Sequence, residues 1–156
     1  MIAAWEYEGA ARCLVLDLKL RGLRGAAGPL VEAMAARVRA VGIAGSVVAW
    51  VPGRTRDIRG RGFDHAAVLA SGLSRRLGLP LVAALTRLAD PPDQAALGAA
   101  ARSLNVAGAF GASGCREPVV LVDDLITTGA TATECAEVLR EFAPSVEVVV
   151  PCRRGR

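Results

Sequence analysis

Hydrophobic and polar residues follow one another in blocks whose spacing predicts helices and strands in turn. In the first block, Arg12 and Lys19 fall one helical face apart from the leucines around them, which indicates a helix. Later apolar residues recur at helical spacing between glycines that end each run. The helices predicted in this way cover residues 9–21, 29–41, 64–77 and 130–142.

Two of these helices have suitable first residues. Pro29 fits the first turn of the second helix, where its missing N–H has no intrahelical partner to lose. Asp64 is a good N-cap for the third helix, because its carboxylate can accept hydrogen bonds from free N–H groups of the first turn. Gly78 is typical of a helix end.

Short apolar runs between these helices predict buried strands. The strands expected are residues 47–51, 106–110, 118–122 and 146–150. Strands that alternate with helices favour a mostly parallel sheet flanked by helices on both faces, which is an α/β fold.

Two segments are predicted to lack regular structure. Residues 54–62 carry four arginines in eight positions and follow directly on the first predicted strand. Residues 85–105 include two adjacent prolines that forbid a continuous helix or strand. A long irregular segment inside a compact domain is usually functional or mobile.

Composition narrows the class of protein. The length of 156 residues fits a single domain, 1–156, and 53% hydrophobic residues with a mean hydropathy of +0.38 exclude intrinsic disorder. The net charge is +4, and all the cations except Lys19 are arginines. Arginine binds phosphate well through its planar fork of donors, so a phosphorylated ligand is compatible with this composition.

Neither a targeting segment nor a metal motif is visible. The N-terminus lacks the pattern of a signal peptide, and charges or prolines interrupt every apolar run before it reaches the length of a membrane span. The four cysteines form no CxxC pair, which argues against a structural zinc site. The expectation is therefore a cytoplasmic protein with reduced thiols and no membrane contact.

Residues 119–131 carry the most specific chemistry. The predicted strand ends at Asp123 and Asp124, and ligands of open α/β sheets bind at that end of the strands. Gly129 then precedes a helix whose free N–H groups suit a phosphate. Hydroxyl donors are available from Thr127, Thr128 and Thr131.

An acidic pair after a strand can also simply cap the next helix, and threonines are common in loops. The coincidence of the acidic pair, the threonine-rich loop and the strand–loop–helix context favours a ligand site. Two carboxylates would repel a phosphate unless they face sugar hydroxyls or a divalent cation such as Mg²⁺.

The run 119–131 resembles the phosphoribosyl pyrophosphate (PRPP) signature of type I phosphoribosyltransferases. Further motifs, in order along nearly the whole chain, resemble the ComF-like group named after a bacterial competence protein. These motifs are Tyr7, Gly9, Arg12 and Lys19, then Val51-Pro52, then Arg61-Gly62-Phe63, then Arg87, Gln94, Arg102, Asn105-Val106 and Gly108-Ala109-Phe110.

The resemblance implies a type I phosphoribosyltransferase fold and an enzyme of the glycosyltransferase class. Its activity would be the transfer of a 5-phosphoribosyl group from PRPP to an unidentified nitrogenous base, with Mg²⁺ as cofactor and release of pyrophosphate. Oxocarbenium-like chemistry of this kind requires no protein nucleophile. The role implied in the cell is nucleotide metabolism.

The resemblance also implies roles for particular residues. Asp123 and Asp124 would bind the ribose hydroxyls and contact Mg²⁺ indirectly, through PRPP or water. The residues expected around the 5-phosphate are Thr127, Thr128, Gly129, Ala130 and Thr131, and those of the pyrophosphate loop are Pro52, Gly53 and Arg54. Residues 86–105 would form a mobile loop over the site.

The chain departs from the group in two respects. It contains no four-cysteine zinc module, and it has Asp64 and His65 where the group usually has Asn and Gln. For His65, a surface or partly satisfied imidazole is favoured over a general base, because the sequence shows no companion nucleophile.

Two other functions stay open. The chain could bind PRPP or a nucleotide as a non-catalytic regulator, or act as a competence-type accessory protein that handles nucleic acid. We expect one or two of the arginines in residues 54–62 to bind an anion and the others to be solvated. The low aromatic content favours only weak DNA contact. A homodimer is also left open.

Overall fold

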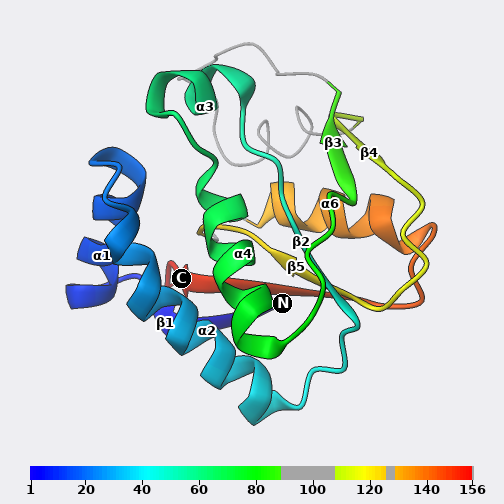
Figure 1. Ribbon diagram of the computed structural model, residues 1–156, viewed down its shortest axis with the longest axis horizontal. Helices are drawn as coiled ribbons and strands as arrows, with labels where there is room; N and C mark the ends of the chain where they lie inside the picture. Colours follow the sequence, from blue (N-terminus) through cyan, green and yellow to red (C-terminus); the bar gives the residue numbers. More distant parts are fainter. Residues whose placement is uncertain (89–107, 126–128, 156) are drawn as a thin grey trace.

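Four parallel strands form the centre of the molecule, which is a computed structural model describing residues 1–88, 108–125 and 129–155 (Figure 1). The strand order is β1-β6-β5-β2, and the middle strand β5 is buried along its whole length. The strands are β1 (Ile2–Glu6), β2 (Val47–Trp50), β5 (Val119–Val122) and β6 (Val146–Arg153).

Successive residues of β5 enter two different hydrophobic cores, because side chains of a strand alternate between the faces of the sheet. Val120 and Val122 pack with three helices on one face, whereas Val119 and Leu121 pack against a single helix on the other. Figure 1 shows α2 and α4 in front of the sheet and α6 behind it. The covering helices are α1 (Gly9–Leu20), α2 (Ala27–Val41), α4 (His65–Leu77) and α6 (Ala130–Arg140).

Smaller elements complete the described chain. The antiparallel strands β3 (Leu85–Arg87) and β4 (Phe110–Ala112) form a separate two-stranded sheet on the α6 side of the main sheet. A single 3₁₀ turn, η1 (Arg24–Ala26), leads into α2, and the short helix α3 (Thr55–Arg61) connects β2 to α4. None of the described helices has the length and apolar character needed to cross a bilayer.

The expected mostly parallel sheet with helices on both faces is confirmed. Each of the four predicted helices forms, although the second begins at Ala27 rather than Pro29 and the last ends at Arg140. The predicted strands 47–51 and 118–122 also form, and the strand predicted over 146–150 continues to Arg153.

Other expectations were wrong. Residues 54–62 are not an irregular loop, because Thr55–Arg61 form α3, whose one large apolar residue gives no periodic pattern to detect. The segment expected to be irregular from residue 85 begins with β3, and the short strand expected at 106–110 begins only at Phe110. The remainder of both segments, 89–107, lies outside the described residues.

The two edges of the sheet differ. The backbone N–H of Val48 in β2 donates to Pro80 O at 2.8 Å, and Val82 N donates back to Val48 O at 2.9 Å. The segment 80–82 thus covers the outer edge of β2. At the opposite edge lies β1, whose only strand partner among the described residues is β6.

Close packing of α2 on α4 depends on Gly72. A Cβ atom at this buried position would lie 2.6 Å from Cγ2 and 3.2 Å from Cγ1 of Val31, far inside van der Waals contact. Val31 is β-branched and stiff, so it cannot turn away easily. The missing side chain therefore sets how closely α4 approaches the helix beside it.

We predict that Gly72→Ala destabilises the fold by about 1–2 kcal/mol, because overpacking outweighs the helix propensity gained. In a Val31→Ala background, where the clash is absent, the same substitution should instead raise the free energy of unfolding. Urea denaturation of the four proteins measures both effects. Destabilisation of equal size in both backgrounds would contradict the packing argument.

Candidate functional site

A polar cavity of about 240 Å³ opens where β2 and β5 end. Parallel pairing places Trp50 opposite Val122, so the chain leaves both strands at the same edge of the sheet. The predicted turn and the predicted acidic pair therefore line one cavity, together with residues from α1, α3, α4, β3 and α6. The lining side chains from the predicted site are those of Pro52, Arg54, Asp123, Asp124 and Thr131, joined by Gly53.

Asp124 is paired with groups from two helices. Its Oδ2 lies 2.9 Å from Nζ of Lys19 in α1 and 3.6 Å from Nδ1 of His65 at the start of α4. Its backbone N–H donates to Oδ1 of Asp123 at 2.8 Å. The acidic pair is thus tied together and neutralised in part by a partly buried network.

The environment separates the pKa values of the two carboxylates. Burial and the neighbouring charge of Asp124 raise the pKa of Asp123 to about 7. Burial opposes ionisation of Asp124 too, but His65 and Lys19 outweigh it and lower the pKa of this carboxyl. Near neutral pH, Asp124 is therefore ionised while Asp123 is partly protonated and can donate as well as accept a hydrogen bond.

Asp64 joins the turn after β2 to the start of α4. Its Oδ2 accepts a hydrogen bond from Gly53 N at 2.8 Å, and its Oδ1 accepts from Ala66 N at 3.0 Å and Ala67 N at 3.4 Å. The predicted N-cap is confirmed. The same carboxylate also fixes the turn, and a Cβ atom at residue 53 would lie only 3.3 Å from it.

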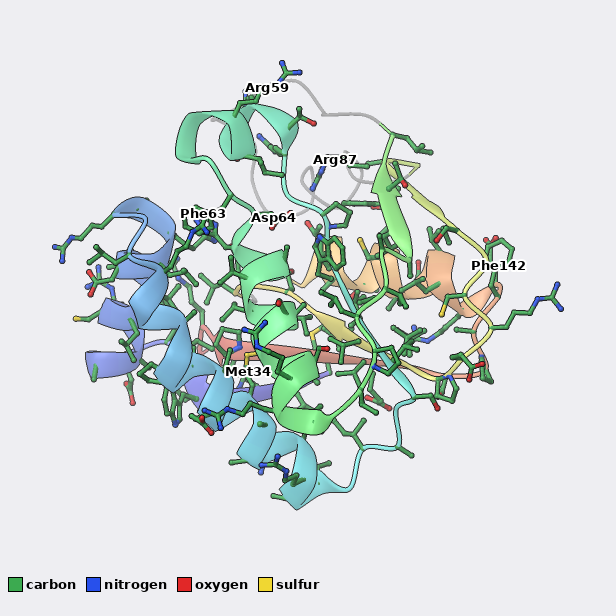
Figure 2. The ribbon with its side chains drawn as sticks, viewed as in Figure 1. Met34, Arg59, Phe63, Asp64, Arg87 and Phe142 are labelled. Atoms are coloured by element: carbon green, nitrogen blue, oxygen red, sulfur yellow. The ribbon has the colours of Figure 1, made fainter. Side chains whose placement is uncertain are left out.

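Arg87 of β3 holds the other side of this turn. Its Nε and Nη2 donate to Pro52 O at 3.1 and 3.0 Å, and its guanidinium carbon lies 4.5 Å from the centroid of the Phe110 ring. Figure 2 shows Arg87 and Asp64 on one side of α3 and Arg59 on the other, outer side. The turn is therefore held by hydrogen bonds with Asp64 on one side and with Arg87 on the other.

The arginines of residues 54–62 are not equivalent. Arg54 is the N-cap residue of α3 and lines the cavity, whereas Arg56 and Arg59 are exposed and belong to no part of the described lining. The side chain of Arg61 lies outside the description. Of the three arginines whose side chains are described, Arg54 lines the cavity, and anion binding by one or two of the group stays a prediction.

The predicted phosphate loop is described in part. Gly129 adopts φ 79°, a left-handed conformation suited to glycine, and is the N-cap of α6, with Ala130 as its first residue. Thr131 in the first turn lines the cavity. Thr127 and Thr128 lie outside the described residues, as do residues 89–105 of the proposed mobile loop.

His65 is not a surface imidazole. The residue is only 4% exposed, its ring packs edge-on against Phe63 with centroids 5.2 Å apart, and its Nε2 is buried with no hydrogen-bond partner among the described atoms. The expectation of a partly satisfied imidazole is met, because its Nδ1 contacts the carboxylate of Asp124. The sequence alone did not indicate this contact, because 59 positions separate the two residues along the chain (124 − 65 = 59).

Lys19 and Arg87 are further site residues to which the sequence assigned no role. Both belong to the motifs that resemble the ComF-like group, which is the one signal that could have marked them. Lys19 lies in the last turn of α1, and Arg87 lies in the segment expected to be irregular. Only folding brings them to the cavity.

The donor set fits a magnesium ion that a ligand brings with it. No group of three potential metal ligands occurs within 1–88, 108–125 and 129–155. Mg²⁺ commonly keeps its waters and binds through one or two carboxylates plus substrate phosphates. Asp123 and Asp124 could contact such an ion through water, as expected from the resemblance.

Comparison with known proteins identifies the fold. The chain matches no family profile and no curated protein. It is similar to the allosteric regulatory enzyme of purine biosynthesis, with a TM-score of 0.52 and 22% identity over 81% of this chain. It is similar to the glutamine PRPP amidotransferase of B. subtilis, complexed with ADP and GMP, with a TM-score of 0.52 and 25% identity over 80% of this chain.

A third similar structure is a protein of Neisseria gonorrhoeae with bound ppGpp, with a TM-score of 0.51 and 14% identity over 81% of this chain and 66% of that one. The chain spans only 26% of the length of each of the first two proteins. The α/β fold, a four-strand parallel sheet flanked by helices, is that of type I phosphoribosyltransferase structures, as expected.

The raised pKa of Asp123 predicts a pH-dependent effect of Asp123→Asn. The folded protein binds this proton more tightly than the unfolded chain does, so ionising Asp123 lowers stability progressively between about pH 4 and pH 7. We expect Asp123→Asn to match the parent near pH 4 and to be more stable above pH 7, by about 4 kcal/mol at most.

Urea denaturation across this pH range measures the difference, with Glu117→Gln, which removes a charge from the exposed surface, as the control. A stability difference between Asp123→Asn and the parent that does not change with pH would show that Asp123 is not the ionising group.

Two substitutions at Asp64 should separate its roles. Asn retains one acceptor and caps helices as well as Asp does, so Asp64→Asn should preserve the cap of α4 and lose the bond from Gly53, at a cost of about 1 kcal/mol. Asp64→Ala loses both and should cost about 2–3 kcal/mol.

Thermal denaturation measures these costs, and hydrogen exchange of the Gly53 amide should accelerate in both variants. A Gly53 amide that stays as protected in Asp64→Asn as in the parent would rule out the proposed link.

Proposed function

We propose that this chain is a phosphoribosyltransferase of the ComF-like group, a single domain over residues 1–156, which binds PRPP with Mg²⁺ and transfers its 5-phosphoribosyl group to a nitrogenous base with release of pyrophosphate. The observation that carries the proposal is the meeting of the turn after β2 and the acidic pair after β5 in one cavity. Similarity of the fold to a PRPP amidotransferase supports it.

The electrostatics of the cavity support an anionic sugar phosphate as ligand. Lys19 and His65 compensate the charge of Asp124, and Asp123 is partly protonated, so the acidic pair repels a phosphate less than two free carboxylates would. Both carboxylates can then hydrogen-bond the ribose hydroxyls. Arg54 is positioned to approach a diphosphate at the turn, which Arg87 and Asp64 hold rigid.

In this proposal Thr131 and the start of α6 bind the 5-phosphate, together with Thr127 and Thr128, through hydroxyls and backbone N–H groups. When bound, Mg²⁺ would neutralise part of the diphosphate charge that develops as the leaving group departs. The chain's own contribution is to bind and orient the ligand and to supply cationic and backbone donors to the diphosphate.

Nucleotide binding without turnover is a second candidate. Two of the similar structures carry nucleotides, ADP and GMP in one and ppGpp in the other. In this form of the proposal, the same cavity binds a phosphorylated nucleotide and the chain acts as a regulator. Pyrophosphate release in a screen over purine and pyrimidine bases supports the enzyme, whereas PRPP or nucleotide binding without release supports the regulator.

Two arginines of α3 and its cap provide a matched test. We predict that Arg54→Ala weakens binding of PRPP with Mg²⁺ by about tenfold or more, since it removes a charged donor beside the turn. Arg59→Ala, on the outer side of the same helix, should leave the affinity within about twofold.

Isothermal titration calorimetry gives both values. Equal weakening by both variants, with a steep dependence on salt, would indicate a non-specific anion surface instead. Absence of any PRPP binding by the parent would remove the enzyme, and absence of nucleotide binding as well would remove the regulator.

A further inference from the structure

A second cavity lies between α2 and α4 and shares no described lining residue with the candidate functional site. Its volume is about 570 Å³, within the range of small-molecule sites. One wall is apolar and is built by Ala27, Val31 and Val68, of which the first two are buried. We call this cavity the α2–α4 groove.

Three exposed arginines, Arg24, Arg75 and Arg76, line the other side of the groove. Arg75 donates to Ser71 Oγ at 2.7 Å, and Arg76 pairs with Glu32. That ion pair is more than half exposed on both sides, so it contributes little to stability and can rearrange. No acidic side chain is among the described residues that line the groove.

Glycine leaves room in the groove. A Cβ atom at Gly28, in the first turn of α2, would meet no atom within 4 Å. The position is exposed, so a side chain there would extend into open space at the groove without disturbing the core. This makes residue 28 a suitable place from which to block the groove.

We propose that the α2–α4 groove is a second binding site, for a small phosphoester that carries a flat ring and is about the size of a mononucleotide. The ring would lie on the apolar wall, and the phosphate would accept hydrogen bonds from two or three of the arginines, whose planar forks suit it. An apolar wall with a few charged groups at one side is the usual construction of such a site.

A line of ring contacts joins the groove to the candidate functional site. The guanidinium carbon of Arg24 lies 4.7 Å from the centroid of the Phe63 ring, and Phe63 packs edge-on against His65, which contacts Asp124. Figure 2 shows Phe63 beside the start of α4, on the side of the N-terminal helices. A phosphate that draws Arg24 off Phe63 changes the packing around His65.

Adenosine 5′-monophosphate is a suitable probe, with adenosine and inorganic phosphate as its two halves. Calorimetry should show that the intact probe binds about tenfold or more tightly than either half, since each half contacts one wall. Gly28→Glu, which adds a carboxylate to the groove, and Arg75→Ala should each weaken binding about tenfold or more, while Arg37→Ala, on the exposed side of α2, should not.

The outcome separates this groove from the candidate functional site. Probe binding that survives Gly28→Glu and Arg75→Ala but is lost in Arg54→Ala would place the probe in the other cavity and overturn the proposal, as would no binding at all. Tighter binding of a single-stranded oligonucleotide, lost in Gly28→Glu, would overturn the small ligand in favour of nucleic acid. The binding claim does not rest on the function proposed for the other cavity.

His65 reports the link between the groove and the candidate functional site directly. It is the only histidine in the sequence, so the proton NMR spectrum contains a single imidazole Hε1 signal. Saturation with adenosine 5′-monophosphate should shift this signal in the parent, and in Arg24→Ala the shift should be smaller even at saturation. A signal that does not move in the parent, although calorimetry shows full binding, would overturn the link.

Discussion

The parallel pairing of β2 with β5 is the constraint on which the candidate site depends. Because Trp50 lies opposite Val122, the turn that follows one strand and the acidic pair that follows the other leave the sheet at the same level. A shift of one residue in this register would exchange the faces of β5 and move each of its four buried side chains to the opposite core. Burial on both faces therefore fixes the site geometry as well as the fold.

Two adjacent carboxylates at the end of a buried strand require cationic or hydrogen-bonding partners, and helices on one face of the sheet supply them. Lys19 comes from the end of α1 and His65 from the start of α4, so Asp124 joins two helices that are distant in sequence. Among the described residues, Asp123 forms no equivalent ion pair, and its proton affinity rises instead. The two carboxylates thus differ in charge although they are neighbours in the sequence.

Local patterns predicted most of the fold, because its helices and inner strands are strongly apolar on the faces that pack. The edge strand β1 and the arginine-rich α3 were missed, since neither has a periodic apolar face long enough to detect. For the site, the resemblance to type I phosphoribosyltransferases implied that Asp123 and the turn at Gly53 belong to one site, and both line the cavity. The contacts of Arg87 with Pro52 and of His65 with Asp124 join distant segments, so no local pattern could indicate them.

The unequal edges of the sheet limit how the molecule can be extended. Along β2, the hydrogen-bonding groups of Val48 that face outward are already used by Pro80 and Val82. Along β1, the described chain adds no further strand, and Trp5 is 40% exposed there. A further strand, whether from another segment or from another molecule, would therefore pair along β1, the edge strand opposite β2. The sheet would then become longer in one direction only.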